Sequence, residues 1–347
     1  MKKLFIRILL LSVAFSFAFG ASAQERPWLK YITPSGYYQA GFRMDDSFDN
    51  SFYIRRARVA LSGLLYERNH SSRLEYKVQA DLANSPKLVD YYFKFALCDE
   101  FGIQFGQFKS PLSIENSEYT PLKLEMIEYS MLVQRFVRMS SDDLSGISST
   151  GREMGLQFYG KLLKLRDGHH LIQYNAAVFN GNGINKMDDD KRKDFVARVQ
   201  IFPIKDLSLT GYYLRTLGPD PGMAPAYNDY HYWIFDRYGG GIAYDSKYAW
   251  FRAEYMAGHT FGWRSEGVYA SAGGKIDSKW GVGARYEYFK NNSRLPGTFF
   301  DHAEQQITGG VSYFPFKHLR LQLNYTLGKE PDLMPTHLVN FMTTIVL

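Results

Sequence analysis

Residues 319–327 read LRLQLNYTL, and apolar and polar side chains alternate at every position of this stretch. Successive side chains of a β-strand point to opposite faces, so one face of this segment is apolar and the other is hydrophilic. The apolar face carries Leu319, Leu321, Leu323, Tyr325 and Leu327, and the polar face carries Arg320, Gln322, Asn324 and Thr326. A soluble sheet could contain one such strand, so the fold depends on how often the pattern recurs.

The same alternation recurs in segments of about ten residues, which is the length of strands that cross an outer membrane. It is clear at residues 74–82, 91–97, 195–201, 249–255 and 282–288. The whole chain predicts sixteen strands, an even number that is typical of bacterial outer-membrane barrels. They are expected to begin near Ser35, Ser51, Ser71, Pro86, Phe101, Arg152, His169, Lys193, Asp206, Tyr238, Lys247, Arg264, Lys279, Ala303, His318 and His337.

The connections between these strands alternate between tight turns and longer loops. Tight turns are predicted at 67–69, 98–100, 166–168, 203–205, 245–247, 277–279 and 315–317, and long loops at 110–151, 181–192, 217–237, 290–302 and 328–336. Only the loop at 83–86 is short where a long one is expected. Short inner turns and long outer loops are typical of membrane barrels, whereas a β-sandwich or propeller has no reason to keep this parity. The predicted fold is an all-β, transmembrane antiparallel β-barrel.

The end of the chain reads as the closing strand of that barrel. Val339, Phe341, Thr343, Ile345 and Leu347 share one face, and no polar tail follows them. Pairing of the last strand with the first would leave no unpaired edge in lipid. An ordinary final strand of a soluble sheet is the alternative.

The beginning of the chain reads as a secretory signal peptide over residues 1–23. A basic flank of Lys2, Lys3 and Arg7 precedes an apolar core, and Ala21-Ser22-Ala23 forms a cleavage site before Gln24. The barrel would then occupy residues 24–347, in the outer membrane of a Gram-negative bacterium. The alternative is an N-terminal membrane anchor. Removal of the segment leaves 38 basic and 35 acidic residues, a charge of +3 that predicts no nucleic-acid partner.

No group of residues predicts catalysis, a cofactor or a metal site. His169 and His170 adjoin a predicted turn, and no second ligand pair has zinc-like spacing. Gly239-Gly240-Gly241 lacks a phosphate-binding pattern, and we expect small residues there because backbone or a loop approaches the wall. The sequence therefore predicts that the protein is not an enzyme.

Basic residues recur on the strand faces predicted to line the lumen. A cation facing lipid at mid-depth would cost about 2–4 kcal/mol, so such side chains must face water or carboxylates. The candidates are Arg56, Arg58, Arg73, Lys77, Lys94 and Arg198, followed by Arg252, Arg285 and Arg320. They favour an anion path because arginine binds phosphate or carboxylate through two parallel hydrogen bonds. A lumen of balanced charge is equally consistent, because Glu75, Asp81, Glu254 and Glu287 lie on the same faces.

The longest connection, residues 110–151, is by parity the third outer loop. It contains many apolar side chains, which an exposed loop would not need: Leu122, Leu124, Met126, Ile127, Met131, Leu132, Val133, Phe136 and Val137. We therefore predict that it folds inward and narrows the pore, with Arg135 and Arg138 at the constriction. The alternative is a loop that reaches over a neighbouring subunit or latches the rim.

Two segments resemble the phosphate-selective porin O and P family: FYIRRARVAL at 52–61 and FGQFKSPLSIE at 105–115. The resemblance implies a sixteen-stranded homotrimer whose lumen lysines and arginines pass inorganic phosphate or polyphosphate. Arg56, Arg58 and Lys109 are the matched basic positions.

Together these features predict an outer-membrane porin for passive diffusion of small anionic solutes. The protein is expected to form a homotrimer, to contact outer-membrane lipid and lipopolysaccharide, and to admit small anions into its lumen. Two alternatives remain open. One is a general or sugar diffusion porin in which aromatic residues line the path, and the other is a structural or receptor barrel plugged by the long loop.

Overall fold

The computed structural model describes residues 31–69, 72–188, 192–217, 235–260, 263–291, 294–295, 298–299, 302–330 and 333–347. The predicted signal peptide, residues 1–23, lies outside this part of the chain. None of the helices in these ranges is long and apolar enough to span a membrane.

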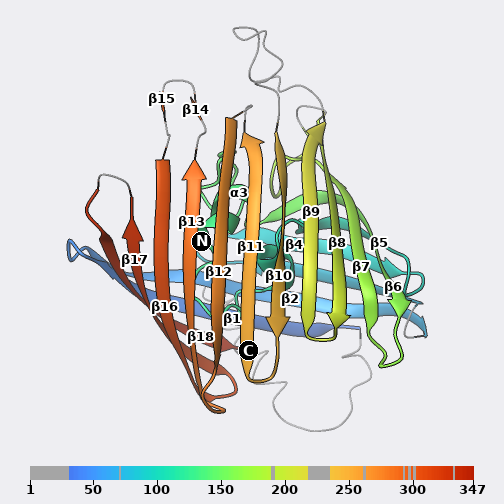
Figure 1. Cartoon of the computed structure of the whole chain (residues 1–347). Helices are drawn as coiled ribbons and strands as arrows, with labels where there is room; N and C mark the ends of the chain where they lie inside the picture. Colours follow the sequence, from blue (N-terminus) through green and yellow to red (C-terminus); the bar gives the residue numbers. More distant parts are fainter. Residues whose placement is uncertain are drawn as a thin grey trace, which may run out of the picture.

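Sixteen antiparallel strands form a closed barrel (Figure 1), which confirms the predicted fold. Each strand begins within two residues of its predicted start. The strands are β1 (Thr33–Asp45), β2 (Asn50–Asn69), β3 (Ser72–Asp81), β4 (Lys87–Ala96), β5 (Gly102–Lys109), β6 (Arg152–Lys164), β7 (His170–Phe179), β8 (Lys193–Ile204), β9 (Leu207–Leu217), β10 (Asp236–Asp245), β11 (Ala249–Thr260), β12 (Trp263–Lys275), β13 (Trp280–Asn291), β16 (His302–Phe316), β17 (Leu319–Lys329) and β18 (Thr336–Val346). Between β13 and β16, β14 (Arg294–Leu295) and β15 (Thr298–Phe299) form a separate two-stranded sheet.

The first and last strands close the barrel. Gln39 of β1 lies opposite Thr344 of β18, and its Nε2 donates a hydrogen bond to Thr344 Oγ1 at 3.1 Å. The backbone N–H of Leu347 donates to the carbonyl of Gly36 at 2.9 Å. This pairing gives the backbone groups of both edge strands the hydrogen bonds that lipid could not supply. The alternating C-terminal segment predicted this closure. Two connections differ from expectation, because β1 and β2 are joined by only residues 46–49, and β11 and β12 by only residues 261 and 262, both on the long-loop side.

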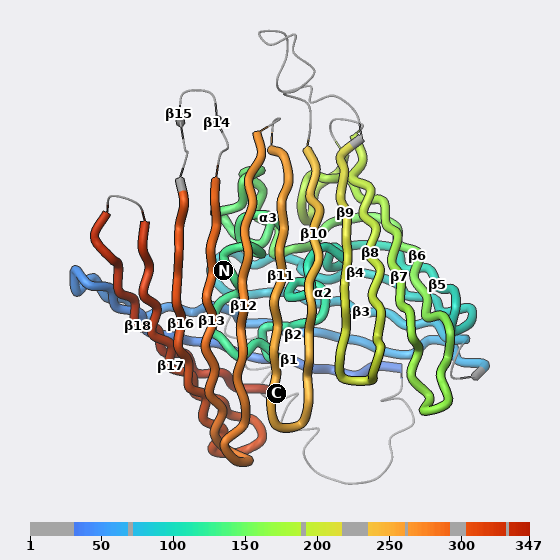
Figure 2. The backbone as a smooth tube through the Cα atoms, viewed as in Figure 1, coloured from blue at the N-terminus to red at the C-terminus, as the bar shows by residue number. Residues whose placement is uncertain are grey.

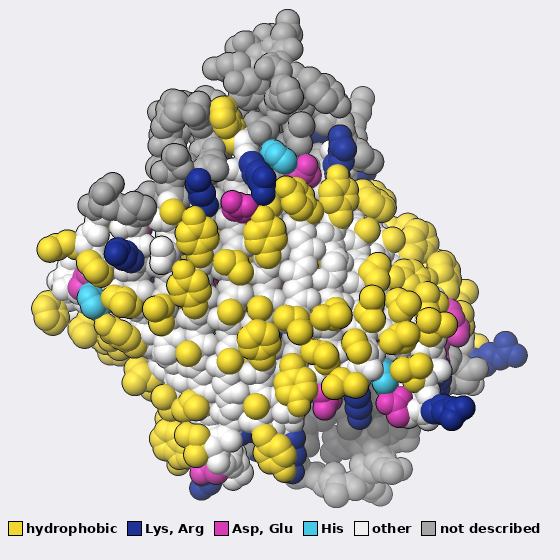
Figure 3. Space-filling model, viewed as in Figure 1, with side chains coloured by type: hydrophobic (Ala, Val, Ile, Leu, Met, Phe, Trp, Pro, Cys, Tyr) yellow, Lys and Arg dark blue, Asp and Glu magenta, His cyan; other side chains and the backbone are white. Residues whose placement is uncertain are grey.

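The alternation that predicted the strands places apolar side chains outside and polar ones inside. In β17, Leu323 is 50% exposed and Tyr325 47%, whereas Gln322 is 2% exposed and Asn324 4%. Hydrophobic side chains cover the middle of the wall in Figure 3, and charged side chains lie near its upper and lower edges. This distribution matches a hydrocarbon layer bounded by two aqueous phases.

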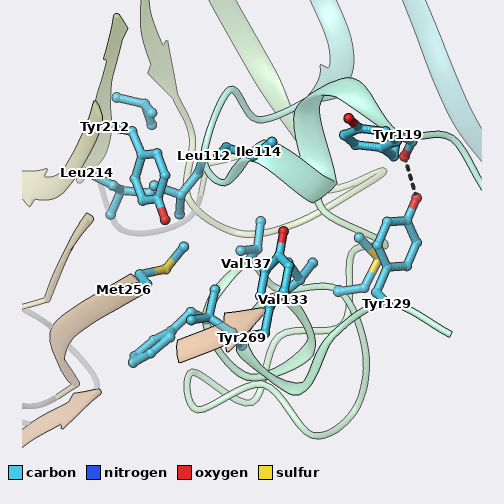
Figure 4. Close-up of a cluster of buried hydrophobic side chains, with 14 of the residues drawn as sticks. Leu112, Ile114, Tyr119, Tyr129, Val133, Val137, Tyr212, Leu214, Met256 and Tyr269 are labelled. Carbon is cyan, nitrogen blue, oxygen red and sulfur yellow. Dashed lines mark hydrogen bonds between the residues drawn. The ribbon is translucent and has the colours of Figure 1, made fainter. Parts of the chain in front are cut away.

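The long loop between β5 and β6 lies inside the ring of strands (Figure 2) and contains two short helices. They are α2 (Ile114–Glu118) and α3 (Met131–Phe136). Their apolar side chains form a buried cluster with wall residues such as Tyr212, Leu214 and Met256, as Figure 4 shows. The barrel therefore has its main apolar core between this loop and part of its own wall.

Glycines on the inner face of the wall leave the room that the loop occupies. A Cβ atom at Gly241 of β10 would lie 3.0 Å from Cδ1 of Ile114, and one at Gly310 of β16 would lie 2.9 Å from the sulfur of Met126. The glycines expected at 239–241 thus stand where the loop and the neighbouring strand approach. Side chains at these positions would push the loop away from the wall.

Candidate functional site

Wall carboxylates hold the two loop helices at their N-terminal ends. Glu254 of β11 accepts hydrogen bonds from the backbone N–H of Ile114 at 2.9 Å and from Ser113 Oγ at 3.1 Å. Glu287 of β13 accepts one from the N–H of Met131 at 2.5 Å. Carboxylates at helix N-termini satisfy backbone donors that have no partner within the helix. These two acids therefore serve the loop instead of balancing the cations on the opposite wall.

Three predicted lumen arginines on the same side also bind the loop. Arg285 donates to the carbonyl of Glu128 at 2.9 Å, and Arg320 donates to the carbonyl of Leu124 at 2.7 Å. Arg252 forms an ion pair with Glu125. Their charges are thus used to fix the loop against β11, β13 and β17.

The opposite wall, from β2 to β8, lines two cavities rich in basic residues. The inner cavity, about 500 Å³, lies toward the short turns, because Cys98, Asp99 and Lys161 line it. The outer cavity, about 150 Å³, lies toward the long loops and is lined by Asn84 and Ser85 between β3 and β4. Arg152 lines both cavities, so their walls meet at its side chain.

The outer cavity contains a cluster of four arginines, of which Arg55, Arg58 and Arg152 each pair with one carboxylate. Its charged lining consists of Arg55, Arg56, Arg58, Lys87, Arg152 and a single acid, Asp81. Arg58 Nε lies 2.9 Å from Asp81 Oδ2, but Arg56 donates only to the neutral Gln39 Oε1 at 2.8 Å. Within the described ranges Arg56 forms no ion pair and is 4% exposed, and the nearby carboxylate of Glu128 is held by Arg55.

The two cavities meet around Asp90 of β4. Arg152 Nε lies 2.5 Å from one carboxylate oxygen of Asp90, and Lys77 Nζ lies 2.8 Å from the other. Lys109 instead donates to two loop carbonyls, those of Asn116 at 2.7 Å and Tyr119 at 2.9 Å. Two cations therefore share one carboxylate, and a third is held by neutral oxygens.

The inner cavity brings together cations from five strands. Its basic lining consists of Arg73, Lys77, Lys94, Lys109, Arg152, Lys161 and Arg198, and its acidic lining of Asp90, Asp99 and Glu118. Arg73 pairs with Glu75 at 2.8 Å, and Lys94 Nζ lies 4.5 Å from the centre of the Tyr159 ring. Arg198 lies 2.7 Å from Glu118.

A sequence model of the phosphate-selective porin O and P family matches residues 35–219 and 255–338. The chain belongs to this family. It is an outer-membrane porin. Among curated proteins, none has a sequence that matches it.

Solved structures with the same fold include other porins. An anion-selective porin from Comamonas acidovorans has a TM-score of 0.66 at 12% identity, with 91% of this chain and 99% of that chain covered. OmpT of Vibrio cholerae in its trimer form gives 0.65 at 13%, covering 91% and 99%. The outer-membrane channel DcaP of Acinetobacter baumannii gives 0.62 at 13%, covering 91% and 97%. At these identities the likeness concerns the fold.

Two predicted site residues of the porin lie elsewhere than expected. Arg138, predicted at the constriction, is 8% exposed and contacts Glu153 at 2.9 Å and Asp194 at 2.6 Å. Arg135 pairs with Glu304 of β16 at 2.7 Å. Neither lines the inner or the outer cavity. Arg138 is buried, and a buried cation requires carboxylate partners, which the wall provides.

One arginine of the porin's outer cavity was not predicted from alternation. The pairing of β1 with β2 shifts by one residue between Gln39 and Ala40, so Arg55 is the extra residue of a β-bulge. Strict alternation would point its side chain at lipid, but Arg55 Nε lies 2.7 Å from Glu128 Oε1 of the loop. Two adjacent arginines in one strand were the available signal, because a regular strand cannot turn both inward.

Proposed function

We propose that this porin passes small anions passively along the β2–β8 wall, with inorganic phosphate among its solutes. The observation that carries this proposal is the division of charge between the two walls. Seven basic and three acidic residues line the inner cavity, and five basic residues and one acid line the outer cavity. An unbalanced cation cluster within a Debye length, about 8 Å in physiological salt, concentrates anions and excludes cations.

Residues 110–151 narrow the lumen in this proposal. Wall residues on both sides hold the loop in place, and the solute path follows the two basic cavities of the β2–β8 side. Several weak cation sites in series suit a channel, because tight binding at one site would stop conduction. Of the basic positions predicted from sequence, Arg56, Arg58, Arg73, Lys77, Lys94, Lys109 and Arg198 would form this path.

The same proposal covers the protein's assembly and processing. Residues 1–23 would be removed as a signal peptide, and residues 24–347 would form the barrel in contact with lipid and lipopolysaccharide. The trimeric form of OmpT supports a homotrimer as the functional unit. Passive conduction requires neither a cofactor nor catalysis, so we propose no enzymatic role.

The test is ion selectivity of the purified trimer in a planar bilayer under a salt gradient, with and without phosphate. The expected result is a reversal potential that favours chloride over potassium, and a chloride current that phosphate lowers. Preference for potassium would overturn the proposal. Complete absence of conductance would instead favour a barrel plugged by the loop.

A further inference from the structure

Arg198 of β8 has an incomplete set of partners in the inner cavity. The residue is 4% exposed, and its buried Nε and Nη2 atoms have no hydrogen-bond partner. Nη2 does lie 2.7 Å from Glu118 Oε1, so the two groups are in electrostatic contact without a well-formed bond. A buried guanidinium that lacks hydrogen-bond acceptors is poorly satisfied, and an oxyanion with several oxygens would complete it.

Glu118 is the counter-ion that such an oxyanion would replace. Its side chain is 46% exposed, and it lines the cavity from the last residue of α2. An ion pair with a solvent-exposed carboxylate contributes little stability, because water screens it and the side chain loses freedom. The loop carboxylate thus occupies the place of an anionic ligand without binding strongly enough to exclude one.

A row of polar side chains extends from Arg198 across neighbouring strands. Asn175 of β7 pairs directly with Arg198 on one side and with Tyr159 of β6 on the other. Arg198 and Tyr159 are therefore two strand spacings apart, about 10 Å. The hydroxyl of Tyr159 is buried and has no hydrogen-bond partner. One inorganic phosphate cannot reach both ends of this row.

Side-chain amides supply further hydrogen-bonding groups in the same cavity. Gln157 donates to Gln104 Oε1 at 3.4 Å, which uses one donor of the first amide and one acceptor of the second. Amides offer both donors and acceptors, as hydroxyl groups require. The cavity volume of about 500 Å³ also lies within the range of about 300–1,000 Å³ that is usual for small-molecule sites.

We propose that the inner cavity is a weak binding site for a phosphorylated monosaccharide. Its phosphate takes the Arg198 guanidinium from Glu118, and its ring hydroxyls bind Asn175, Tyr159 and the amides of Gln104 and Gln157. The proposal rests on the anion conduction proposed above and names a solute class for it. It also assigns Glu118 as a built-in competitor that keeps binding weak enough for release.

The test is block of chloride current through the whole trimer by glucose 6-phosphate, inorganic phosphate and glucose, each added alone. Glucose 6-phosphate is expected to block at the lowest concentration. Glu118→Gln should lower its half-blocking concentration several-fold, since the competing charge is gone. Glu266→Gln is the matched control, because Glu266 lies outside the cavity and pairs with the exposed Arg264.

Tyr159→Phe separates the sugar from the phosphate. Loss of one hydrogen bond should raise the half-blocking concentration of glucose 6-phosphate about 2- to 10-fold and leave that of inorganic phosphate unchanged. Tyr286→Phe, on the lipid-facing side, is the control. An anion-selective channel that glucose 6-phosphate blocks no better than phosphate, or a Glu118→Gln variant with unchanged or weaker block, overturns this inference alone. A channel that prefers cations overturns the proposed function as well.

Discussion

Replacement of Arg56 by glutamine tests whether a charge that makes no ion pair in the described residues controls selectivity in the outer cavity. Arg56 is 4% exposed and bonds to the neutral Gln39, so the substitution removes a full charge without leaving an orphaned acid. A unit charge about 4 Å from an ion contributes about 1 kcal/mol even in bulk water. Because 1.4 kcal/mol corresponds to a tenfold change, anion occupancy should fall about fivefold and cation occupancy should rise by a similar factor.

The assay is the reversal potential across a bilayer under a KCl gradient, at about 0.1 M and again near 1 M salt. The shift toward potassium should be large in dilute salt and small near 1 M, where the Debye length is about 3 Å. Arg264→Gln, an exposed rim substitution outside both cavities, should change little. The double variant Arg58→Gln with Asp81→Asn removes a salt-bridged pair and keeps the net charge, so it should also change little. An unchanged reversal potential in a folded Arg56→Gln trimer at 0.1 M would refute the reasoning.

Three further predictions concern the loop and the inner cavity. Gly310→Leu places a side chain against Met126, so it should destabilise the folded barrel by about 1–3 kcal/mol. The measurement is the temperature at which heat-modifiable migration on a gel is lost, which should fall. An unchanged temperature would contradict the contact between the loop and the wall at this position. Burial raises the pKa of Glu128, but the charge and hydrogen bonds of Arg55 together with the charges of Arg56 and Arg285 outweigh burial and leave the pKa below its ordinary value. The stability from the Arg55–Glu128 pair is therefore present above the unfolded pKa and is lost only as pH falls through the lower folded pKa. Open-channel noise should stay constant from pH 7 to about pH 5, and a rise of the noise within that window would count against the pair. Cys98 lines the inner cavity, so an anionic thiol reagent should modify it faster than a cationic reagent of equal size, and equal rates in dilute salt would argue against a basic cavity.

The strands and the closure of the barrel could be predicted because the information is local. Alternation within residues 319–327 depends only on neighbouring side chains and on which medium each face meets. The same local rule fails at Arg55, where one extra residue in β2 changes the face on which a side chain lies. A bulge is a property of two paired strands, so one strand's pattern does not reveal it.

The positions of the loop residues could be predicted only in part. Apolar composition indicated that residues 110–151 need a buried surface, but the partners of Arg138 are Glu153 and Asp194, the second more than fifty positions away in the chain. In the same way, Glu254 and Glu287 read as opposing charges in the lumen until the helices that they bind are placed beside them. Long-range pairing decided which charges remain available to solutes.

The glycine recesses beneath the loop have a consequence for how such a channel can change over generations. Substitutions on the strands that carry these recesses must preserve the packing of the loop against the wall, and selection would remove most changes there. The facing arc also holds the loop, through residues such as Arg55, Lys109 and Asp194, but its cavity-lining positions between these contacts meet solute and not the loop. Descendants of this protein could therefore acquire new solute preferences by mutating one half of the circumference while the other half stays the same.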